Sequence, residues 1–139
     1  MQEIFFVSLY SYLLGSIPFG LIIIKTFTKK NIKEVGSGNI GATNVLRTGN
    51  KFFSLLTLLL DAVKGYIAVS ITNNIYSDYF TLSALVVFLG HLFPIWLKFN
   101  GGKGVATYFG ILFAINIWLA IVFTFLWIVI IFLTKYASL

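Results

Sequence analysis

Two polar, glycine-rich stretches hold most of the side chains in this sequence that could bind a charged group. The first runs from Gly36 to Arg47, and the second runs from Gly101 to Thr107. Glycines let successive backbone N–H groups turn inward and surround an anion. Arg47 adds a planar, bidentate donor for phosphate, and Lys103 adds a mobile point charge. The two stretches therefore predict a site for a ligand that carries phosphate.

Familiar motifs for phosphate or acyl chemistry do not fit these stretches. A Walker A loop needs Ser or Thr after its Lys, but Lys103 is followed by Gly104. A Gly-x-Ser-x-Gly nucleophile elbow is missing, and the acyltransferase pattern of His with Asp five residues later fails because Trp96 stands at that distance from His91. No pair of acids suggests general acid–base catalysis. The simpler alternative is that the glycines only allow tight turns and that Arg47 reaches lipid headgroups.

The composition places both stretches in a membrane protein. Of 139 residues, 59% are hydrophobic and only 10% are charged, whereas a soluble domain carries about 25% charged residues. The sequence has no cysteine, which excludes thiol catalysis and cysteine-based metal sites, and the single His91 cannot form a metal site alone. The net charge of +6 does not indicate nucleic-acid binding, because the basic residues flank apolar segments. There they set topology and contact anionic headgroups.

Four apolar segments are long enough to cross a bilayer, for which a helix needs about 20 residues. They are residues 4–24, 52–71, 79–97 and 105–133. The last has 29 residues, which is too long for one untilted helix and short for two, so Asn116 could divide it. The sequence thus predicts an all-α, polytopic transmembrane bundle of four or five helices, forming one domain over residues 1–139.

The basic residues predict the orientation of this bundle. Residues 25–51 carry six Lys and Arg residues against the single acid Glu34, which places this segment in the cytoplasm and the N-terminus outside. Residues 72–78 carry no Lys or Arg and should lie outside. Both glycine-rich stretches then face the cytoplasm. Lys135 joins them if the segment from residue 105 crosses the membrane an even number of times.

Three further residues interrupt the apolar segments. Pro18 removes a backbone donor and should kink the first helix, either for close packing or to open a cavity near the polar loops. Asp61 and Lys64 are three residues apart within the second segment, so they share a helix face and can pair. A charge inside a membrane marks a functional site by default. The alternative is a structural ion pair that docks this helix to its neighbours.

Several of these motifs together resemble the bacterial acyl-phosphate-dependent glycerol-3-phosphate acyltransferases. The matching motifs are Gly15-Ser16-Ile17-Pro18-Phe19-Gly20, the segment from Ser37 to Arg47, Asp61-Ala62-Val63-Lys64-Gly65, Gly90-His91-Leu92-Phe93-Pro94 and the segment from Phe99 to Thr107. They occur in the family's order and cover the whole chain. The resemblance implies a multi-pass protein of the bacterial inner membrane that transfers an acyl group from acyl phosphate to glycerol 3-phosphate. The products are lysophosphatidate and phosphate, and no cofactor is needed.

The resemblance also implies roles for individual residues. Ser37 would orient the attacking hydroxyl or bind substrate, Arg47 and Lys103 would hold phosphates, and His91 would complete the polar lining. The substrate-binding set would be Gly38, Asn39, Gly41, Thr43, Asn44, Gly101, Gly102, Gly104 and Thr107. The glycines at 101, 102 and 104 would supply the amide nest. The residues themselves leave alternatives open: loop-internal capping for Asn39 and Asn44, and a satisfied buried imidazole for His91.

One departure from the family pattern affects the expected activity. Family members carry further helices and a third polar motif near the C-terminus, and nothing in this sequence matches that motif. We therefore expect a truncated chain that has weak or no activity unless a second polypeptide supplies the rest. An inactive remnant is one alternative. A small transporter or channel subunit that uses Asp61, Lys64 and the glycine-rich loops as a polar pathway is another.

Overall fold

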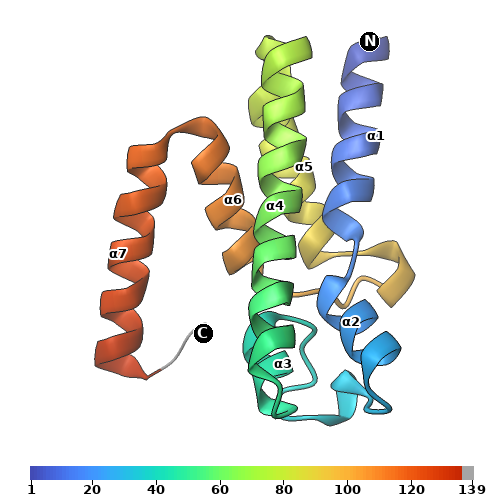
Figure 1. Ribbon diagram of the computed structural model, residues 1–139. Coiled ribbons are helices and arrows are strands. Elements are labelled where there is room, and N and C mark those ends of the chain that lie inside the picture. Colours follow the sequence, from blue (N-terminus) through green and yellow to red (C-terminus); the bar gives the residue numbers. More distant parts are fainter. Residues whose placement is uncertain (136–139) are drawn as a thin grey trace.

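The computed structural model describes residues 1–135 as a helical protein built around one long central helix. The α-helices are α1 (Gln2–Ser16), α2 (Phe19–Phe27), α3 (Ala42–Arg47), α4 (Lys51–Ile75), α5 (Phe80–Leu92), α6 (Val105–Ile115) and α7 (Ile117–Thr134). Three short 3-10 helices, η1 (Ile32–Glu34), η2 (Ser77–Tyr79) and η3 (Ile95–Leu97), lie in the connections. The central helix α4 contacts α1, α2, α3, α5 and α6, while α7 packs on α6 and stands apart from α4 (Figure 1).

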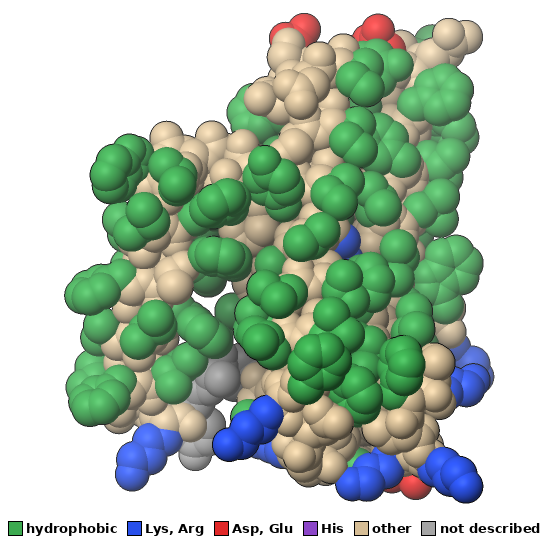
Figure 2. Space-filling model, viewed as in Figure 1, with side chains coloured by type: hydrophobic (Ala, Val, Ile, Leu, Met, Phe, Trp, Pro, Cys, Tyr) green, Lys and Arg blue, Asp and Glu red, His purple; other side chains and the backbone are tan. Residues whose placement is uncertain are grey.

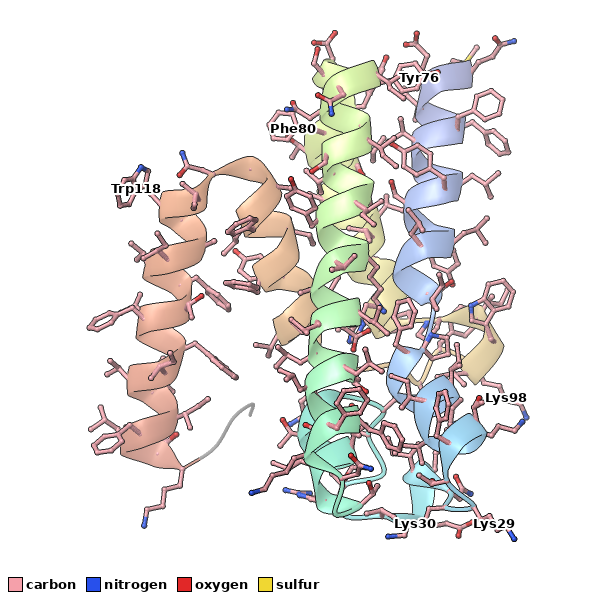
Figure 3. All side chains as sticks on the ribbon, viewed as in Figure 1. Lys29, Lys30, Tyr76, Phe80, Lys98 and Trp118 are labelled. Atoms are coloured by element: carbon pink, nitrogen blue, oxygen red, sulfur yellow. The ribbon has the colours of Figure 1, made fainter. Side chains whose placement is uncertain are left out.

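The expected membrane bundle is confirmed. Four helical segments are long and apolar enough to cross a bilayer, namely Gln2–Phe27, Lys51–Ile75, Ser77–Leu97 and Ile117–Thr134. The helix Val105–Ile115 is apolar but shorter. Lys and Arg side chains gather at one end of the molecule, acidic side chains lie at both ends, and mostly hydrophobic side chains cover the surface between them (Figure 2). Lys29, Lys30 and Lys98 mark the basic end, whereas Tyr76 lies near the opposite end (Figure 3).

Both predicted helix breaks are present, and each has a local cause. Helix α1 ends at Ser16 and α2 begins at Phe19, on either side of Pro18, which has no N–H to continue the helix. Asn116 separates α6 from α7, because its backbone is extended (φ −162°, ψ 124°) and its side chain accepts the Trp118 and Leu119 N–H groups. Helix α7 therefore runs back along α6, and its C-terminal end returns toward the end that carries α3 (Figure 1).

Helices approach closely where glycine removes a side chain. Gly15 of α1 faces the backbone of Val87 in α5, and Gly110 of α6 faces the backbone of Ala62 in α4. Small residues of this kind allow transmembrane helices to pack backbone to backbone. Between α1 and α5, the buried hydroxyls of Ser11 and Ser83 also share a hydrogen bond of 2.8 Å. These contacts fix α1, α5 and α6 around α4 and so position the two polar loops.

Candidate active site

A cavity of about 410 Å³ lies between the two glycine-rich loops, α4, α6 and α7. One end of its lining is polar and includes Ser37, Asn39, Thr43, Asn44, Arg47, Asp61, His91 and Lys103. The remainder is largely apolar and includes Leu58, Phe109, Phe123, Trp127 and Ile131. The surface is hollowed between α7 and α4 (Figure 2). The cavity therefore offers a charged compartment continuous with an apolar one that opens between helices.

Nine of the thirteen residues singled out from the sequence line this cavity. They are Ser37, Asn39, Gly41, Thr43, Asn44, Arg47, His91, Lys103 and Gly104. The two loops are more than forty residues apart in the sequence, so this grouping depends on α4 and α5 bringing their ends together. Gly38, Gly101, Gly102 and Thr107 are not among the lining residues.

Asn44 organises the first loop from within. Its Oδ1 accepts the Ser37 N–H at 3.1 Å, and its Nδ2 donates to the carbonyls of Ile32 at 3.1 Å and Asn39 at 2.8 Å. Asn39 in turn accepts the Gly41 N–H through Oδ1 at 2.9 Å. Both asparagines thus form the loop-internal caps that were one of the two alternatives for them, while also lining the cavity. These hydrogen bonds within the chain hold the loop in shape.

In the Asn44→Ala variant, the first loop should therefore be less stable than in the wild type. The substitution leaves the Ser37 N–H and the carbonyls of Ile32 and Asn39 without this partner, and the bond to Ile32 is buried, where an unsatisfied group costs about 1–3 kcal/mol. We expect a lower thermal midpoint in lipid than for the wild type. The matched control is Asn31→Ala in the same loop, because Asn31 is exposed and caps only η1. Equal midpoints for the two variants would contradict this role of Asn44.

The second loop does not form the expected anion nest at Gly101 and Gly102. The Gly101 N–H donates to the Leu92 carbonyl at 3.0 Å, and the Gly102 N–H donates to the His91 carbonyl at 3.1 Å. These carbonyls belong to the last turn of α5, which has no helical partners left for them. The two glycines therefore cap α5. A Cβ at either position would overlap His91, so glycine at both positions lets the loop backbone approach His91 closely.

The other two residues outside the cavity also have structural surroundings. Thr107 is fully buried, and its carbonyl lies against Gly65 of α4, where α4 and α6 meet. Gly38 has a left-handed backbone (φ 69°) and donates its N–H to the Val35 carbonyl at 3.0 Å. Thr107 thus supports helix packing, and Gly38 supports a turn of the first loop.

Asp61 is a lining residue that sequence reasoning did not include in the site. Its predicted pairing with Lys64 is confirmed, with Oδ1 2.8 Å from Lys64 Nζ. The same oxygen lies 3.7 Å from Nδ1 of His91. Lys64 Nζ also donates to the carbonyl of Ile17 at 2.7 Å. A charged residue within a membrane-spanning segment was the signal in the sequence that could have placed Asp61 in the site. Its approach to His91 of α5 could not be identified from the spacing of residues.

The polar compartment carries net positive charge. Arg47, Lys103 and Lys135 all line the cavity, whereas Asp61, the one acid that lines it among residues 1–135, is paired with Lys64. Arg47 lies over Gly36, where a Cβ would come within 2.6 Å of Arg47 Cδ, so the absence of a side chain at Gly36 makes room for it. A cationic pocket joined to an apolar groove suits an amphiphile with a phosphate head and an acyl tail.

Comparisons with known proteins agree with this geometry. Residues 5–139 match the family model described as glycerol-3-phosphate acyltransferase. The glycerol-3-phosphate acyltransferase of Pelagibacter ubique (strain HTCC1062) is 58% identical over 138 residues, which are 99% of this chain and 72% of that protein. The corresponding protein of Wolbachia sp. subsp. Brugia malayi is 54% identical over 99% of this chain and 73% of its own length. The chain therefore spans somewhat under three quarters of these relatives.

Two solved structures share the fold. The glycerol 3-phosphate form of PlsY, an integral membrane glycerol 3-phosphate acyltransferase, superposes with a TM-score of 0.90 at 37% identity, covering 96% of this chain and 68% of that one. The lysophosphatidic acid form superposes with a TM-score of 0.83 at 38% identity, covering 92% and 64%. The motifs, the fold and the cationic cavity thus agree, and the chain belongs to the glycerol-3-phosphate acyltransferase family, of the integral membrane PlsY type.

Proposed function

We propose that this cavity binds an acyl phosphate and glycerol 3-phosphate together and joins them. The observation that carries the proposal is the single cavity with a cationic compartment at one end and an apolar groove at the other. A hydroxyl oxygen of glycerol 3-phosphate attacks the acyl carbonyl carbon, and the bond from that carbon to the phosphate oxygen breaks. The hydroxyl proton leaves with the phosphate. The products are lysophosphatidate and inorganic phosphate.

The donor chemistry explains why the cavity needs no nucleophile of its own. An acyl phosphate is a mixed anhydride, so it is already activated and phosphate is its leaving group. Catalysis then rests on holding the reacting atoms in place and on stabilising negative charge. Arg47 and Lys103 would neutralise the phosphates, and Ser37 would orient the attacking hydroxyl. Asn39, Thr43 and His91 would complete the polar wall.

The apolar part of the cavity suits the acyl chain. Phe109 of α6, together with Phe123 and Trp127 of α7, lines this apolar part of the cavity. An acyl chain lying there would remain level with the apolar belt of the protein, while its phosphate reached the basic end (Figure 2). The clustering of Lys and Arg at that end supports a cytoplasmic location for both loops and an outside N-terminus, in a bacterial inner membrane.

An acyl-transfer assay tests the proposal directly. The chain is purified into lipid nanodiscs and given labelled glycerol 3-phosphate with either palmitoyl phosphate or palmitoyl-CoA. We expect lysophosphatidate from palmitoyl phosphate, one inorganic phosphate released per product, and none from palmitoyl-CoA. Product from palmitoyl-CoA alone would overturn the choice of donor. A folded chain that makes no lysophosphatidate from either donor would overturn the activity proposed for this chain.

A further inference from the structure

A line of buried polar groups crosses the bundle beside the cavity. Lys64 and Asp61 of α4 are each 3% exposed, and His91 of α5 is 4% exposed. Lys64 Nζ bonds to the Ile17 carbonyl at 2.7 Å and lies 2.8 Å from Asp61 Oδ1. Asp61 Oδ1 lies 3.7 Å from His91 Nδ1, an atom that makes no hydrogen bond within residues 1–135. The line therefore connects the α1–α2 break to α5.

A contribution to folding stability does not by itself explain why Asp61 and Lys64 are buried in this bundle. A buried ion pair costs several kcal/mol of desolvation per ion, so packed apolar residues in its place are often as stable or more stable. Because Asp61 and Lys64 both belong to α4, their pairing joins no two helices. Contacts that do join elements include the hydrogen bond from Lys64 to Ile17 and the approach of Asp61 to His91. Lys64 Nζ also lies over the ring of Phe19 in α2, 5.6 Å from its centroid.

One end of the line meets the first glycine-rich loop. Ile17 is extended (φ −66°, ψ 116°) at the break before Pro18, which turns its carbonyl toward Lys64. Three residues on, Gly20 packs so closely on the Ile40 carbonyl that a Cβ there would overlap it. Ile40 belongs to the first loop. Lys64 thus holds the break, and the break supports the loop that carries Ser37 and Arg47.

The other end of the line meets the second loop. The His91 ring presents Nε2 to Gly102, at a distance where a Cβ would overlap the ring. The Gly102 N–H also donates to the His91 carbonyl at 3.1 Å. The His91 ring therefore lies between Asp61 on one edge, 3.7 Å from Nδ1, and Gly102 on the other. With Nε2 against the backbone, this ring is placed to support the loop.

We propose that Lys64 and Asp61 are positioning residues, which set the two glycine-rich loops at the separation that acyl transfer requires. The inference rests on the proposed function. The pair acts through Ile17 on the first loop and through His91 on the second. This role requires no contact between Lys64 and substrate, and Lys64 is not among the residues that line the cavity.

The test uses the double substitution Asp61→Asn/Lys64→Met, which removes both charges and so leaves no unpaired buried ion. The matched control is Thr57→Val, because Thr57 is also fully buried in α4 and its hydroxyl bonds only to Phe53 of the same helix. Since the sequence has no cysteine, two cysteines introduced by Lys51→Cys and Lys98→Cys would be the only residues that the spin label modifies. Both positions are exposed, one at the start of α4, shortly after the first loop, and one at the end of η3, shortly before the second loop.

We expect the double variant to keep the wild-type helical content and thermal midpoint. Its kcat should fall about tenfold or more, because a small displacement of reacting groups is costly in the transition state, while the KM for glycerol 3-phosphate changes by less than about threefold. The spin–spin distance distribution should broaden. The control should match the wild type in all five measurements.

Two results would overturn the inference. One is a double variant that keeps kcat within twofold of the wild type. The other is an unchanged distance distribution, which can be measured whether or not the chain is active. Failure of the proposed function is a different result, because then the wild type itself makes no lysophosphatidate. In that case the distance distribution alone decides whether the pair positions the loops.

Discussion

Arg47→Ala is expected to reduce lysophosphatidate formation by about 100- to 1,000-fold, the loss that follows removal of one donor to a developing negative charge. Arg47 lines the polar end of the cavity and ends α3, so its position depends on the first loop. Its stem lies over Gly36, which fixes its direction toward the cavity. Lys103 comes from the opposite loop and cannot replace a bidentate donor. The assay with palmitoyl phosphate and labelled glycerol 3-phosphate measures this loss.

Two further variants separate charge from geometry at this position. Arg47→Lys keeps the charge but loses the planar fork, so its activity should lie between those of wild type and Arg47→Ala. Lys29→Ala removes a basic residue of the exposed end that does not line the cavity, and its activity should equal that of the wild type (Figure 3). Activity of Arg47→Ala within about threefold of wild type would show that the phosphates bind elsewhere. Equal losses in Lys29→Ala would indicate a general charge effect.

The helix plan could be predicted from the sequence because its signals are local or averaged over many residues. Apolar segments of membrane-spanning length identify the helices without any knowledge of tertiary contacts. Pro18 and Asn116 break helices through their own chemistry, a missing N–H in one case and a side-chain acceptor in the other. The pairing of Asp61 with Lys64 is likewise a consequence of helical spacing. Each of these features is determined by a few neighbouring residues or by the residues of one helix.

The interior of the site was harder to predict, because it depends on contacts between elements. Glycines in a row favour an amide nest, but the N–H groups of Gly101 and Gly102 donate to carbonyls at the end of α5 instead. Only the folded chain brings those carbonyls to the loop. The approach of Asp61 to His91 has the same origin, since it depends on how α4 and α5 are rotated against each other. Spacing within one helix carries no such information.

Gly110→Ala is expected to lower the free energy of unfolding by about 3 kcal/mol, the upper part of the usual range for overpacking. A Cβ at Gly110 would overlap the carbonyl of Ala62, and a backbone atom in the middle of α4 cannot move aside as a flexible side chain could. The sign of the effect is informative. Helix propensity alone would make Ala more stable than Gly by about 1 kcal/mol. A loss therefore reports the contact between α4 and α6.

The control for this prediction is Gly41→Ala in the first loop. Gly41 has an ordinary backbone (φ −78°), and the nearest atom to a Cβ there is Asn39 Oδ1 at 3.4 Å, a normal contact distance. Thermal unfolding in lipid, followed by circular dichroism, compares the two variants with wild type. Because α6 begins at Val105, two residues after Lys103, displacing it from α4 should also widen the cavity and reduce acyl transfer. If Gly110→Ala is as stable as Gly41→Ala, then α4 and α6 do not pack backbone to backbone in the membrane.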